Sequence, residues 1–388
     1  MVPIKVGIDA RFAGISQGGI GRYVEHTVRE LLKLATPWNY VIFLRKNGWN
    51  LFDGALREGD KKMLADIPWY GAEEQLRMPY ILRSHSCDVY HYPHFNVPYT
   101  APRPFVMTLH DMIMWEEGRA RDTMHQPLKA RCKEFGMRII VRRALERAHT
   151  WVAPTTWVKE RVEHITGLSS ARGVVIPEGA DALARVTPTA WGTLKNVLGI
   201  DAKYFLMVGS AYRHKGNDVV LRAMAQARTT LSDYILVHAG PAHPSSLHSQ
   251  LLALGEKLLG NRYRHVGEVS NEALAALYQH AEAYVSASYQ EGFGLPALES
   301  LQQGTPAIVP RATCFPEVLG DAAYYFTLGD VDELCRALIT FAESPALRKQ
   351  FCVLGITHAK QYTWKQHAQA LIPLYESSMG AISLPRTS

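Results

Sequence analysis

Residues Glu291–Glu299 read EGFGLPALE, and this stretch governs the interpretation of the whole chain. Its two carboxylates flank a Gly-Phe-Gly turn, and the apolar run that follows has the composition of a helix, with Pro296 at the first helical position. Glu291 is therefore predicted on the loop before the helix, and Glu299 one turn inside it. Backbone N–H groups at such a helix start bind anions, and carboxylates accept hydrogen bonds from hydroxyl groups. A phosphate next to hydroxyls is the chemistry of a sugar nucleotide.

The flanking sequence favours a binding site over two merely solvated glutamates. Upstream, ALAALYQHAEAYVSASY predicts a helix and then an apolar strand, and downstream GTPAIVP predicts a second buried strand. Strand, glycine loop, helix and strand form one βαβ unit, with the two glutamates at the carboxyl end of a strand. Ligands bind at such strand ends in open α/β sheets.

Both halves of the chain alternate strands with helices, which predicts two doubly wound parallel sheets. In the first half the predicted strands are Ile4–Ile8, Tyr40–Leu44, Val89–Tyr92, Phe105–Leu109, Trp151–Ala153 and Val174–Ile176, and the predicted helices are Tyr23–Lys33, Ile139–His149 and Trp157–Thr166. In the second half the predicted strands are Tyr204–Val208, Tyr234–Ala239, His265–Val266, Tyr284–Ser286 and Ala307–Val309, and the predicted helices are Asp218–Ala227, Ser246–Leu259 and Asn271–His280. The stretch Glu178–Thr193 lacks strong periodicity and carries Gly and Pro, so we interpret it as a hinge.

Seven motifs, in order, resemble the retaining glycosyltransferases of family 4. They are GGIGRY (Gly18–Tyr23), Leu109-His110-Asp111, VIPEGAD with Glu178 where the family usually has Asn, VGSAYRHKG (Val208–Gly216), HVGEVSNEALAALY (His265–Tyr278), YVSASYQEGFGLPALESLQQGTPAIVP and the closing YTWKQHAQALIPLYES. The resemblance implies the GT-B fold, in which two Rossmann-like α/β domains face a central cleft and a C-terminal helix returns to the N-terminal domain. We expect an acceptor-binding domain over residues 1–182 with the returning helix at 364–388, and a nucleotide-sugar donor-binding domain over residues 183–363.

The resemblance also implies roles for individual residues. Donor contacts are expected from Gly18, Gly19, Gly209, Val269, Gly292, Phe293, Gly294, Leu295 and Glu299, with Glu299 on the ribose and Val269 on the base. Glu291 is expected to bind a hydroxyl of the donor sugar. Lys215, and Arg213 where the spacing allows, would stabilise the departing diphosphate; because two cations can replace a metal ion there, we expect no metal and no cofactor beyond the donor.

The acceptor side is less clearly marked in the sequence. The resemblance places His110 near the reacting sugar, with a purely structural histidine as the alternative, while Asp111 would orient its ring or cap the segment that follows. The aromatic segments Trp69–Tyr80 and Trp115–Gln126 are further candidates for acceptor contacts. Ordinary partial burial explains them equally well.

The implied reaction moves a hexose from a nucleotide sugar to a glycan or lipid-linked saccharide with retention. Front-face attack is favoured over a double displacement with Glu291 as nucleophile, because Glu291 is better placed for a hydroxyl than for the anomeric carbon. GIDARF together with GGIGRY resembles bacterial mannosyltransferase-like members, so GDP-mannose is the expected donor. UDP-glucose, UDP-N-acetylglucosamine and a dTDP-deoxysugar stay open, as do three other readings: a UDP-sugar 2-epimerase, a nucleotide-sugar sensor and a pyridoxal-phosphate phosphorylase.

Composition predicts a cytoplasmic protein. No apolar run reaches the roughly 18 residues that span a membrane, and the five cysteines are scattered without a C-x-x-C pair, which argues against disulfides and a zinc site.

The net charge of +6 lies in the first half of the chain. Residues 1–185 hold 26 Lys and Arg against 20 Asp and Glu, while the rest holds 16 of each, and the basic residues are densest over Arg119–Arg147. We expect this patch to meet an anionic membrane surface or an anionic acceptor, or to be a solvated helix face. Nucleic acid is not an expected partner because no nucleic-acid module is recognisable, and the oligomeric state stays open.

Overall fold

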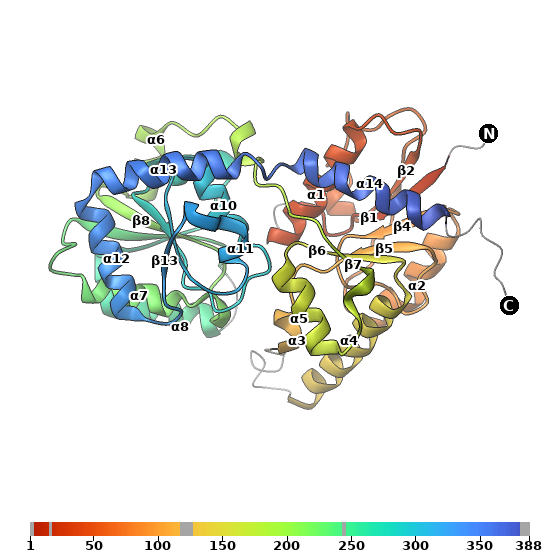
Figure 1. The fold of residues 1–388 in the computed structure, drawn as a ribbon, viewed down its shortest axis with the longest axis horizontal. Helices are drawn as coiled ribbons and strands as arrows, with labels where there is room; N and C mark the ends of the chain where they lie inside the picture. The colour runs from red at the N-terminus through yellow and green to blue at the C-terminus, as the bar shows by residue number, and fades with distance from the viewer. Residues whose placement is uncertain (1–3, 15–17, 117–126, 243–245, 381–388) are drawn as a thin grey trace. The chain divides into compact units, whose positions relative to one another are not determined.

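The computed structural model describes residues 4–14, 18–116, 127–242 and 246–380. The chain divides into two compact units, which we call unit 1 (residues 1–179 and 363–388) and unit 2 (residues 180–362). Both are α/β units built on a parallel sheet (Figure 1). The sequence-based boundaries, after residues 182 and 363, lie three residues and one residue later than this division.

Unit 1 contains a seven-stranded sheet in the order β3-β2-β1-β4-β5-β6-β7, with every neighbouring pair parallel. Its strands are β1 (Lys5–Asp9), β2 (Asn39–Leu44), β3 (Lys61–Leu64), β4 (Val89–Tyr92), β5 (Phe105–Thr108), β6 (Thr150–Ala153) and β7 (Gly173–Val175). Its described helices are α1 (Gly18–Lys33), α2 (Ala72–Arg83), α3 (Ile113–Glu116), α4 (Pro127–Arg147), α5 (Thr156–Thr166) and α14 (Trp364–Gly380). The strand order reverses between β1 and β4, so the carboxyl ends of these strands mark a topological switch point.

Unit 2 contains a six-stranded parallel sheet in the order β10-β9-β8-β11-β12-β13. Its strands are β8 (Lys203–Val208), β9 (Tyr234–Ala239), β10 (Tyr263–Gly267), β11 (Ala283–Val285), β12 (Ala307–Pro310) and β13 (Tyr324–Phe326). Its described helices are α6 (Trp191–Leu198), α7 (Asn217–Gln226), α8 (Ser246–Leu259), α9 (Asn271–His280), α10 (Leu295–Gln302), α11 (Phe315–Leu319), α12 (Val331–Glu343) and α13 (Pro345–Ala359). Here the order reverses between β8 and β11.

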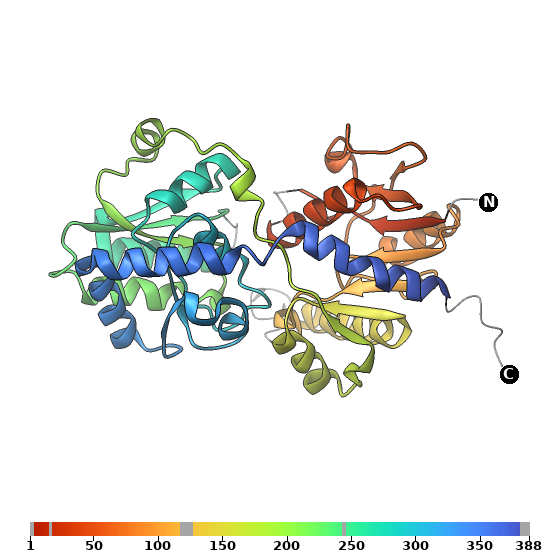
Figure 2. The ribbon, with the colours of Figure 1, turned by 45° about the horizontal axis from the view of Figure 1, so that its top comes forward.

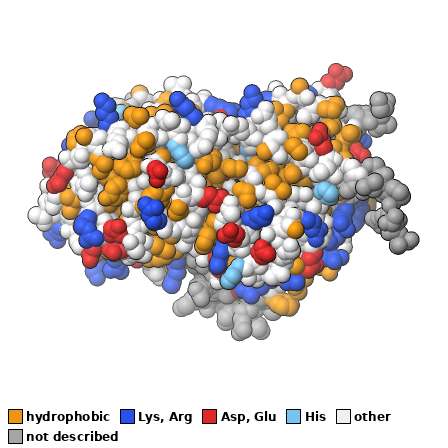
Figure 3. All heavy atoms as spheres, viewed as in Figure 1, with side chains coloured by type: hydrophobic (Ala, Val, Ile, Leu, Met, Phe, Trp, Pro, Cys, Tyr) orange, Lys and Arg blue, Asp and Glu red, His pale blue; other side chains and the backbone are white. Residues whose placement is uncertain are grey.

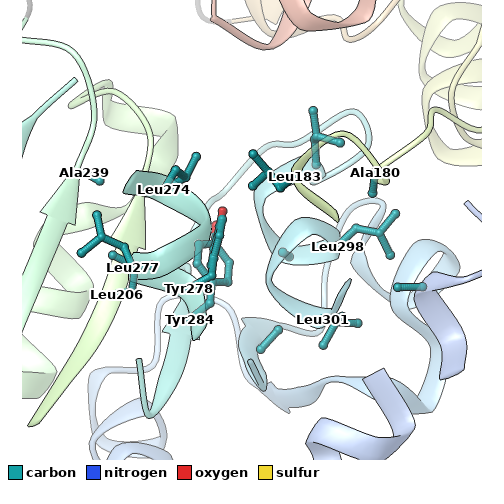
Figure 4. Close-up of a cluster of buried hydrophobic side chains, with 14 of the residues drawn as sticks. Ala180, Leu183, Leu206, Ala239, Leu274, Leu277, Tyr278, Tyr284, Leu298 and Leu301 are labelled. Atoms are coloured by element: carbon teal, nitrogen blue, oxygen red, sulfur yellow. The ribbon is translucent and has the colours of Figure 1, made fainter. Parts of the chain in front are cut away.

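One face of the unit 2 sheet packs against α9 and α10 through a buried apolar cluster. Leu206 and Tyr284 from the strands meet Leu277 and Leu298 from the helices, as Figure 4 shows. The side chains in this cluster are almost completely removed from water. This burial fixes α10, and with it the loop that precedes it, against the sheet.

Helix α14 follows unit 2 in the sequence but completes unit 1. It packs on α1, β4 and β5, and Figures 1 and 2 both show the blue α14 beside the red α1. Trp364 and Tyr375 are buried on its inner face. The predicted return of the last helix to the N-terminal part of the chain therefore agrees with the structure.

Three sequence-based assignments need correction. The helix predicted from Tyr23 begins at Gly18, five residues earlier, so the GGIGRY segment belongs to α1. The helix predicted from Ile139 begins at Pro127, twelve residues earlier. The stretch interpreted as a hinge is mostly part of unit 2, which begins at Ala180, and Ala180 and Leu183 are buried in its core.

Candidate functional site

The loops that follow β8 and β11 meet at the switch point of unit 2. Lys215, in the short 3-10 helix Arg213–Lys215 after β8, places its Nζ atom 2.7 Å from Oε1 of Glu291, which lies on the loop after β11. Both side chains are largely shielded from solvent, with 23% and 13% exposed. The sequence nominated both residues but for separate roles, and the structure brings them into one ion pair.

Backbone contacts hold these two loops together. The carbonyl of His214 accepts hydrogen bonds from the Tyr289 amide (2.6 Å) and the Ser288 hydroxyl (2.9 Å). Gly216 has a φ of +59°, and a Cβ there would lie 2.1 Å from the carbonyl oxygen of Ala287. Only glycine fits a left-handed position this close to another backbone. Lys215 is thus held next to the end of β11 from both sides.

Three adjacent strands of unit 2 end at glycines whose backbones touch. The Gly209 amide bonds to the carbonyl of Ala239, and the Gly240 amide bonds to the carbonyl of Gly267 (both 2.9 Å). A Cβ on Gly240 would lie 2.0 Å from the Gly209 carbonyl oxygen. The absence of side chains leaves bare backbone along this edge of the sheet, which is what a close approach of a phosphate requires.

The His238 side chain, on β9, holds the same edge of the sheet through hydrogen bonds. Its Nε2 lies 2.8 Å from the Gly209 carbonyl oxygen, and its Nδ1 lies 2.9 Å from the Tyr263 hydroxyl. Because a carbonyl only accepts, Nε2–H donates and Nδ1 accepts from Tyr263 in the neutral ring. Burial, and then the neighbouring His265 and His248, lower the pKa of His238 to about 4. No motif in the sequence marks this histidine, because its partner Tyr263 lies on the neighbouring strand β10.

The EGFGLPALE segment has the predicted form, a loop followed by helix α10. Gly294 precedes the helix in a left-handed conformation (φ 77°), and a Cβ there would lie 2.8 Å from the Phe315 ring. Glu299 lies one turn inside the helix and is 2% exposed. Phe293 and Leu295 direct their side chains into the apolar cluster, so these two residues can offer a ligand only their backbone groups.

The remaining nominated residues of unit 2 differ in exposure. Arg213 is exposed. In the described part of the chain it is Lys215, and not Arg213, that pairs with Glu291. Val269 lies on the turn between β10 and α9 and packs partly on the apolar cluster. The turn ends where the Ser270 hydroxyl caps α9 by accepting from the Ala273 amide.

In unit 1, the histidine that follows β5 is bonded at both ring nitrogens. Nδ1 of His110 lies 2.9 Å from Oε1 of Glu178, and Nε2 lies 2.8 Å from the Pro93 carbonyl oxygen. Asp111 accepts a hydrogen bond from the Ile113 amide (2.9 Å) at the start of α3. Of the two roles expected for Asp111, the structure thus shows the capping of the next segment, while Glu178 and Pro93 orient the His110 ring.

A buried hydrogen-bonded chain runs beside His110. Nδ1 of His367, on α14, donates to the Pro177 carbonyl (2.8 Å), because a carbonyl cannot donate. Burial lowers the pKa of His367 to about 4. The ring is therefore neutral, and its Nε2 accepts from the Tyr23 hydroxyl at 3.1 Å.

The direction of every further bond in this chain then follows. The Tyr23 hydroxyl donates its one hydrogen to His367, so it accepts a hydrogen bond from the Thr108 hydroxyl (2.9 Å). Thr108 in turn accepts from Nε2 of His91 (3.1 Å). Burial lowers the pKa of His91 to about 3, so its Nδ1 accepts from the Tyr375 hydroxyl at 2.8 Å. Sequence reasoning missed this chain because its members come from four separate elements.

Gly18 and Gly19 are exposed at the start of α1. A Cβ on either residue would meet none of the described atoms within 4 Å, and Gly18 has a φ of +64°. Among the described residues of unit 1, therefore, packing does not require glycine at either position. The positive φ of Gly18 is the one feature here that favours glycine.

A second charged cluster lies buried at the end of β1. The Arg11 guanidinium bonds to Asp9 (2.7 Å) and to Glu74 (2.6 Å) from α2. Burial opposes the charge of Arg11, but the two carboxylates outweigh it and raise the pKa of Arg11 further. The GIDARF motif contains Asp9 and Arg11, but it gives no sign that Glu74 of α2 completes the cluster.

Among the described residues, no group of three or more His, Cys, Asp or Glu side chains is arranged to hold a metal ion. The chain does contain one Asp-Val-Asp sequence, in which Asp330 caps α12 through the Glu333 amide and Asp332 accepts from Gln226. In the described part of the chain, no helix has the length and apolarity to cross a bilayer. The acceptor candidates at residues 117–126 lie outside the described residues.

Two family models cover most of the chain. The model "Glycosyl transferases group 1" matches residues 193–352, and the model "Glycosyltransferase Family 4" matches residues 17–182. Among solved structures, sucrose-phosphate synthase from Thermosynechococcus elongatus is similar with a TM-score of 0.78 at 19% identity, over 97% of this chain and 100% of that one. HepE from Anabaena, solved with UDP-glucose, is similar with a TM-score of 0.73 at 17% identity, over 96% of this chain and 99% of that one. The two parallel-sheet units therefore have the GT-B fold.

Curated relatives include mannosyltransferases. O-antigen chain mannosyltransferase B of Escherichia coli is 34% identical over 113 residues, which are 29% of this chain and 30% of that protein. Lipopolysaccharide core biosynthesis mannosyltransferase LpcC of Rhizobium leguminosarum is 24% identical over 69% of this chain and 79% of that protein. The matches to the first relatives span between about a third and about half of their length. With both family models, these relatives show that the chain belongs to glycosyltransferase family 4.

Proposed function

We propose that the protein transfers a hexose from a nucleotide sugar to a glycan or a lipid-linked saccharide, and that unit 2 binds the donor. The observation that carries this proposal is the Lys215–Glu291 ion pair at the switch point of unit 2. It combines a cation for a diphosphate with a carboxylate for sugar hydroxyls, next to a row of glycine backbones. Ligands of doubly wound sheets bind at this position.

Lys215 is proposed to stabilise the negative charge of the departing diphosphate, with Arg213 as an exposed second cation. Glu291 keeps the Lys215 side chain oriented before the donor arrives, so little reorganisation is needed when charge develops. Preorganised groups of this kind lower a barrier by about 3 to 4 kcal/mol each. We propose that the reaction needs no metal ion for this reason.

We propose front-face attack with retention of configuration. The acceptor oxygen bonds to the anomeric carbon as the bond from that carbon to the phosphate oxygen breaks, and the departing phosphate takes the acceptor's proton. The ion pair supports this over a double displacement, because a carboxylate that is neutralised by Lys215 is a weaker nucleophile. Mass spectrometry of enzyme quenched during turnover tests it: a glycosyl adduct on Glu291 would establish the double displacement.

GDP-mannose is the proposed donor, supported by the mannosyltransferase relatives. The structural relative HepE was solved with UDP-glucose, a donor that differs from GDP-mannose in both base and sugar. The experiment therefore has to vary both parts of the donor. A thermal-shift panel of GDP-, UDP- and dTDP-sugars identifies the donor, since a ligand that binds only the native protein raises its melting temperature. We expect the largest rise with GDP-mannose. A larger rise with UDP-glucose would reassign the donor, and no rise with any nucleotide sugar would reject the proposed function.

We further propose that unit 1 meets an anionic membrane surface. The Arg143 guanidinium lies over the ring of the exposed Tyr99, and Arg147 of the same helix, α4, bonds to the Tyr99 carbonyl. Arg83 of α2 and Arg103 of the loop between β4 and β5 lie close enough to Arg147 to repel it. Their mutual repulsion contributes, after burial, to lowering the pKa of Arg147. Leu76 and Tyr80 on α2 are 77% and 76% exposed, and the Tyr99 amide bonds to Gln75 of the same helix.

This patch pairs exposed apolar side chains with a cluster of positive charge that repels itself, which suits an acidic lipid surface. Acidic and basic side chains are interspersed over most of the face drawn in Figure 3. Co-sedimentation with vesicles that contain phosphatidylglycerol tests the proposal. Binding should be weakened by salt and by the double substitution R83A/R143A, whereas equal binding to neutral vesicles would reject it.

A further inference from the structure

Among the described residues, the hydrogen-bond partners of the two His110 ring nitrogens are both acceptors. Its partners are the Glu178 carboxylate and the Pro93 carbonyl oxygen, at 2.9 and 2.8 Å. A neutral imidazole has only one N–H, so satisfying both partners requires the doubly protonated ring. A proton shared between a histidine and a glutamate stays on the ring, since the ordinary pKa values are about 6.5 and about 4.3.

Other rings pack around the His110–Glu178 pair. Tyr23 contacts the His110 ring edge-on at 4.4 Å between centroids, and His94 lies over it at 5.9 Å. Two further buried histidines of unit 1, His91 and His367, are neutral because burial lowers their pKa values to about 3 and about 4. Burial lowers the pKa of His110. The hydrogen bond and charge of Glu178, the Pro93 carbonyl and the charge of Asp111 act in the opposite direction and outweigh burial, so the pKa is raised overall.

Glu178 itself is held on both sides. The carbonyl of the preceding Pro177 accepts from His367 of α14. The following Gly179 packs against the same helix so closely that a Cβ would lie 2.2 Å from the Trp364 amide nitrogen. The carboxylate therefore has little freedom to leave His110, and the ion pair is fixed before any ligand binds.

We propose that Glu178 is a positioning residue that keeps His110 as a fixed imidazolium, so that His110 supplies a positive charge and accepts no proton during transfer. The role in transfer rests on the proposed function. A neutral side chain such as Asn at this position would supply no charge, so the fixed imidazolium depends on the Glu178 carboxylate. His110 is thereby removed as a general base, in agreement with a reaction in which the leaving phosphate takes the proton.

The charge state is tested without any reaction. Full-length protein with ¹⁵N-labelled histidine is measured by long-range ¹H–¹⁵N NMR, with the His110 signal assigned from H110N. We expect the imidazolium pattern at pH 7.5, where free histidine is neutral, and its loss in E178Q, which keeps the shape and removes the charge. E178D should restore it. A neutral His110 in the unmodified protein at pH 7.5 would overturn the proposal, whether or not E178Q folds.

The consequence for the reaction is tested by the pH profile of kcat. In E178Q, kcat at pH 8 should fall by about tenfold relative to pH 6, because the ring now loses its proton in this range. The matched control is E74Q, which also removes a buried carboxylate of unit 1 but from Arg11, a cation that does not titrate here. An E178Q profile that parallels the unmodified protein would reject the role in transfer. Failure of the proposed function would instead appear as no transfer at all, with the NMR result intact.

Discussion

Nζ of Lys215 lies 2.7 Å from Oε1 of Glu291, although the two residues are 76 positions apart in the sequence. The parallel order of the unit 2 sheet places β8 beside β11, so the loops that follow them share one edge. A cation and a carboxylate in contact at this edge are available together to a phosphorylated sugar. The first prediction follows directly from this contact.

Replacing Lys215 with Met should lower kcat by about 100- to 1000-fold, because the developing charge on the diphosphate loses its cation. K203A is the matched control, since Lys203 lies exposed at the start of β8; it should keep full activity. The double variant K215M/E291Q measures the coupling between the two side chains. Additive effects of the two single substitutions would show that the ion pair has no joint role.

Replacing Glu299 with Gln should weaken donor binding by about 10- to 100-fold, because a hydrogen bond to a charged acceptor contributes about 1.5 to 3 kcal/mol. E299A should abolish transfer. Calorimetric titration with the nucleotide sugar and with the free nucleotide measures the loss, which should be equal for both if Glu299 binds the ribose. Unchanged affinity for the nucleotide in E299Q would reject that role.

Unit 1 should lose stability as the pH falls below about 6.5. The pKa values of His91 and His367 are lowered by burial to about 3 and about 4, so the unfolded chain binds more protons than the folded one between these values and about 6.5. Each histidine then costs up to about 1.4 kcal/mol of unfolding free energy per pH unit. Seven of the eight tryptophans belong to unit 1, so denaturation followed by tryptophan fluorescence reports on it.

The variant H367N should flatten this pH dependence, since one of the two depressed groups is gone. Its stability at pH 7 should also be lower, because the Tyr23 hydroxyl and the Pro177 carbonyl lose their shared partner. If the unfolding free energy of H367N changed with pH as steeply as that of the unmodified protein, His367 would be shown to titrate normally in the folded state.

Replacing Arg11 with Met should destabilise unit 1 by about 3 to 5 kcal/mol, because the substitution leaves two buried carboxylates without their cation. Adding E74L should recover part of this loss, since an apolar pair removes one of the uncompensated charges. Urea denaturation at pH 7 measures both. A loss below about 1 kcal/mol in R11M would mean that water reaches Asp9 and Glu74.

The sequence predicted elements well where hydrophobic runs were continuous. The central strand Tyr234–Ala239 and the helix Asn271–His280 were predicted with the bounds observed in the structure. Strand β3 was missed because its residues, KKML, are exposed or half-buried at the edge of the sheet and therefore lack an apolar signal. The early turns of α4 were missed because that helix is too polar to show clear periodicity.

The contacts within the candidate site could not be read from the sequence in the same way. Motifs nominated His110 and noted the unusual Glu178, but nothing along the chain shows that they meet across 68 residues. That meeting depends on the order β4-β5-β6-β7, which brings the segments after β5 and β7 to one edge. Likewise, the chain from Tyr375 to Pro177 needs the return of α14, and only the three-dimensional structure assigns direction to its protons.

The return of α14 also has a consequence for synthesis. A ribosome releases the first 179 residues long before residues 364–380, so unit 1 waits without the helix that covers Tyr23 and His91 until unit 2 has been made. During that interval the partly built first unit exposes apolar and polar groups that the finished molecule hides. Nascent chains stalled before residue 364 should therefore be cleaved by proteases in unit 1, and chains extended beyond residue 380 should resist.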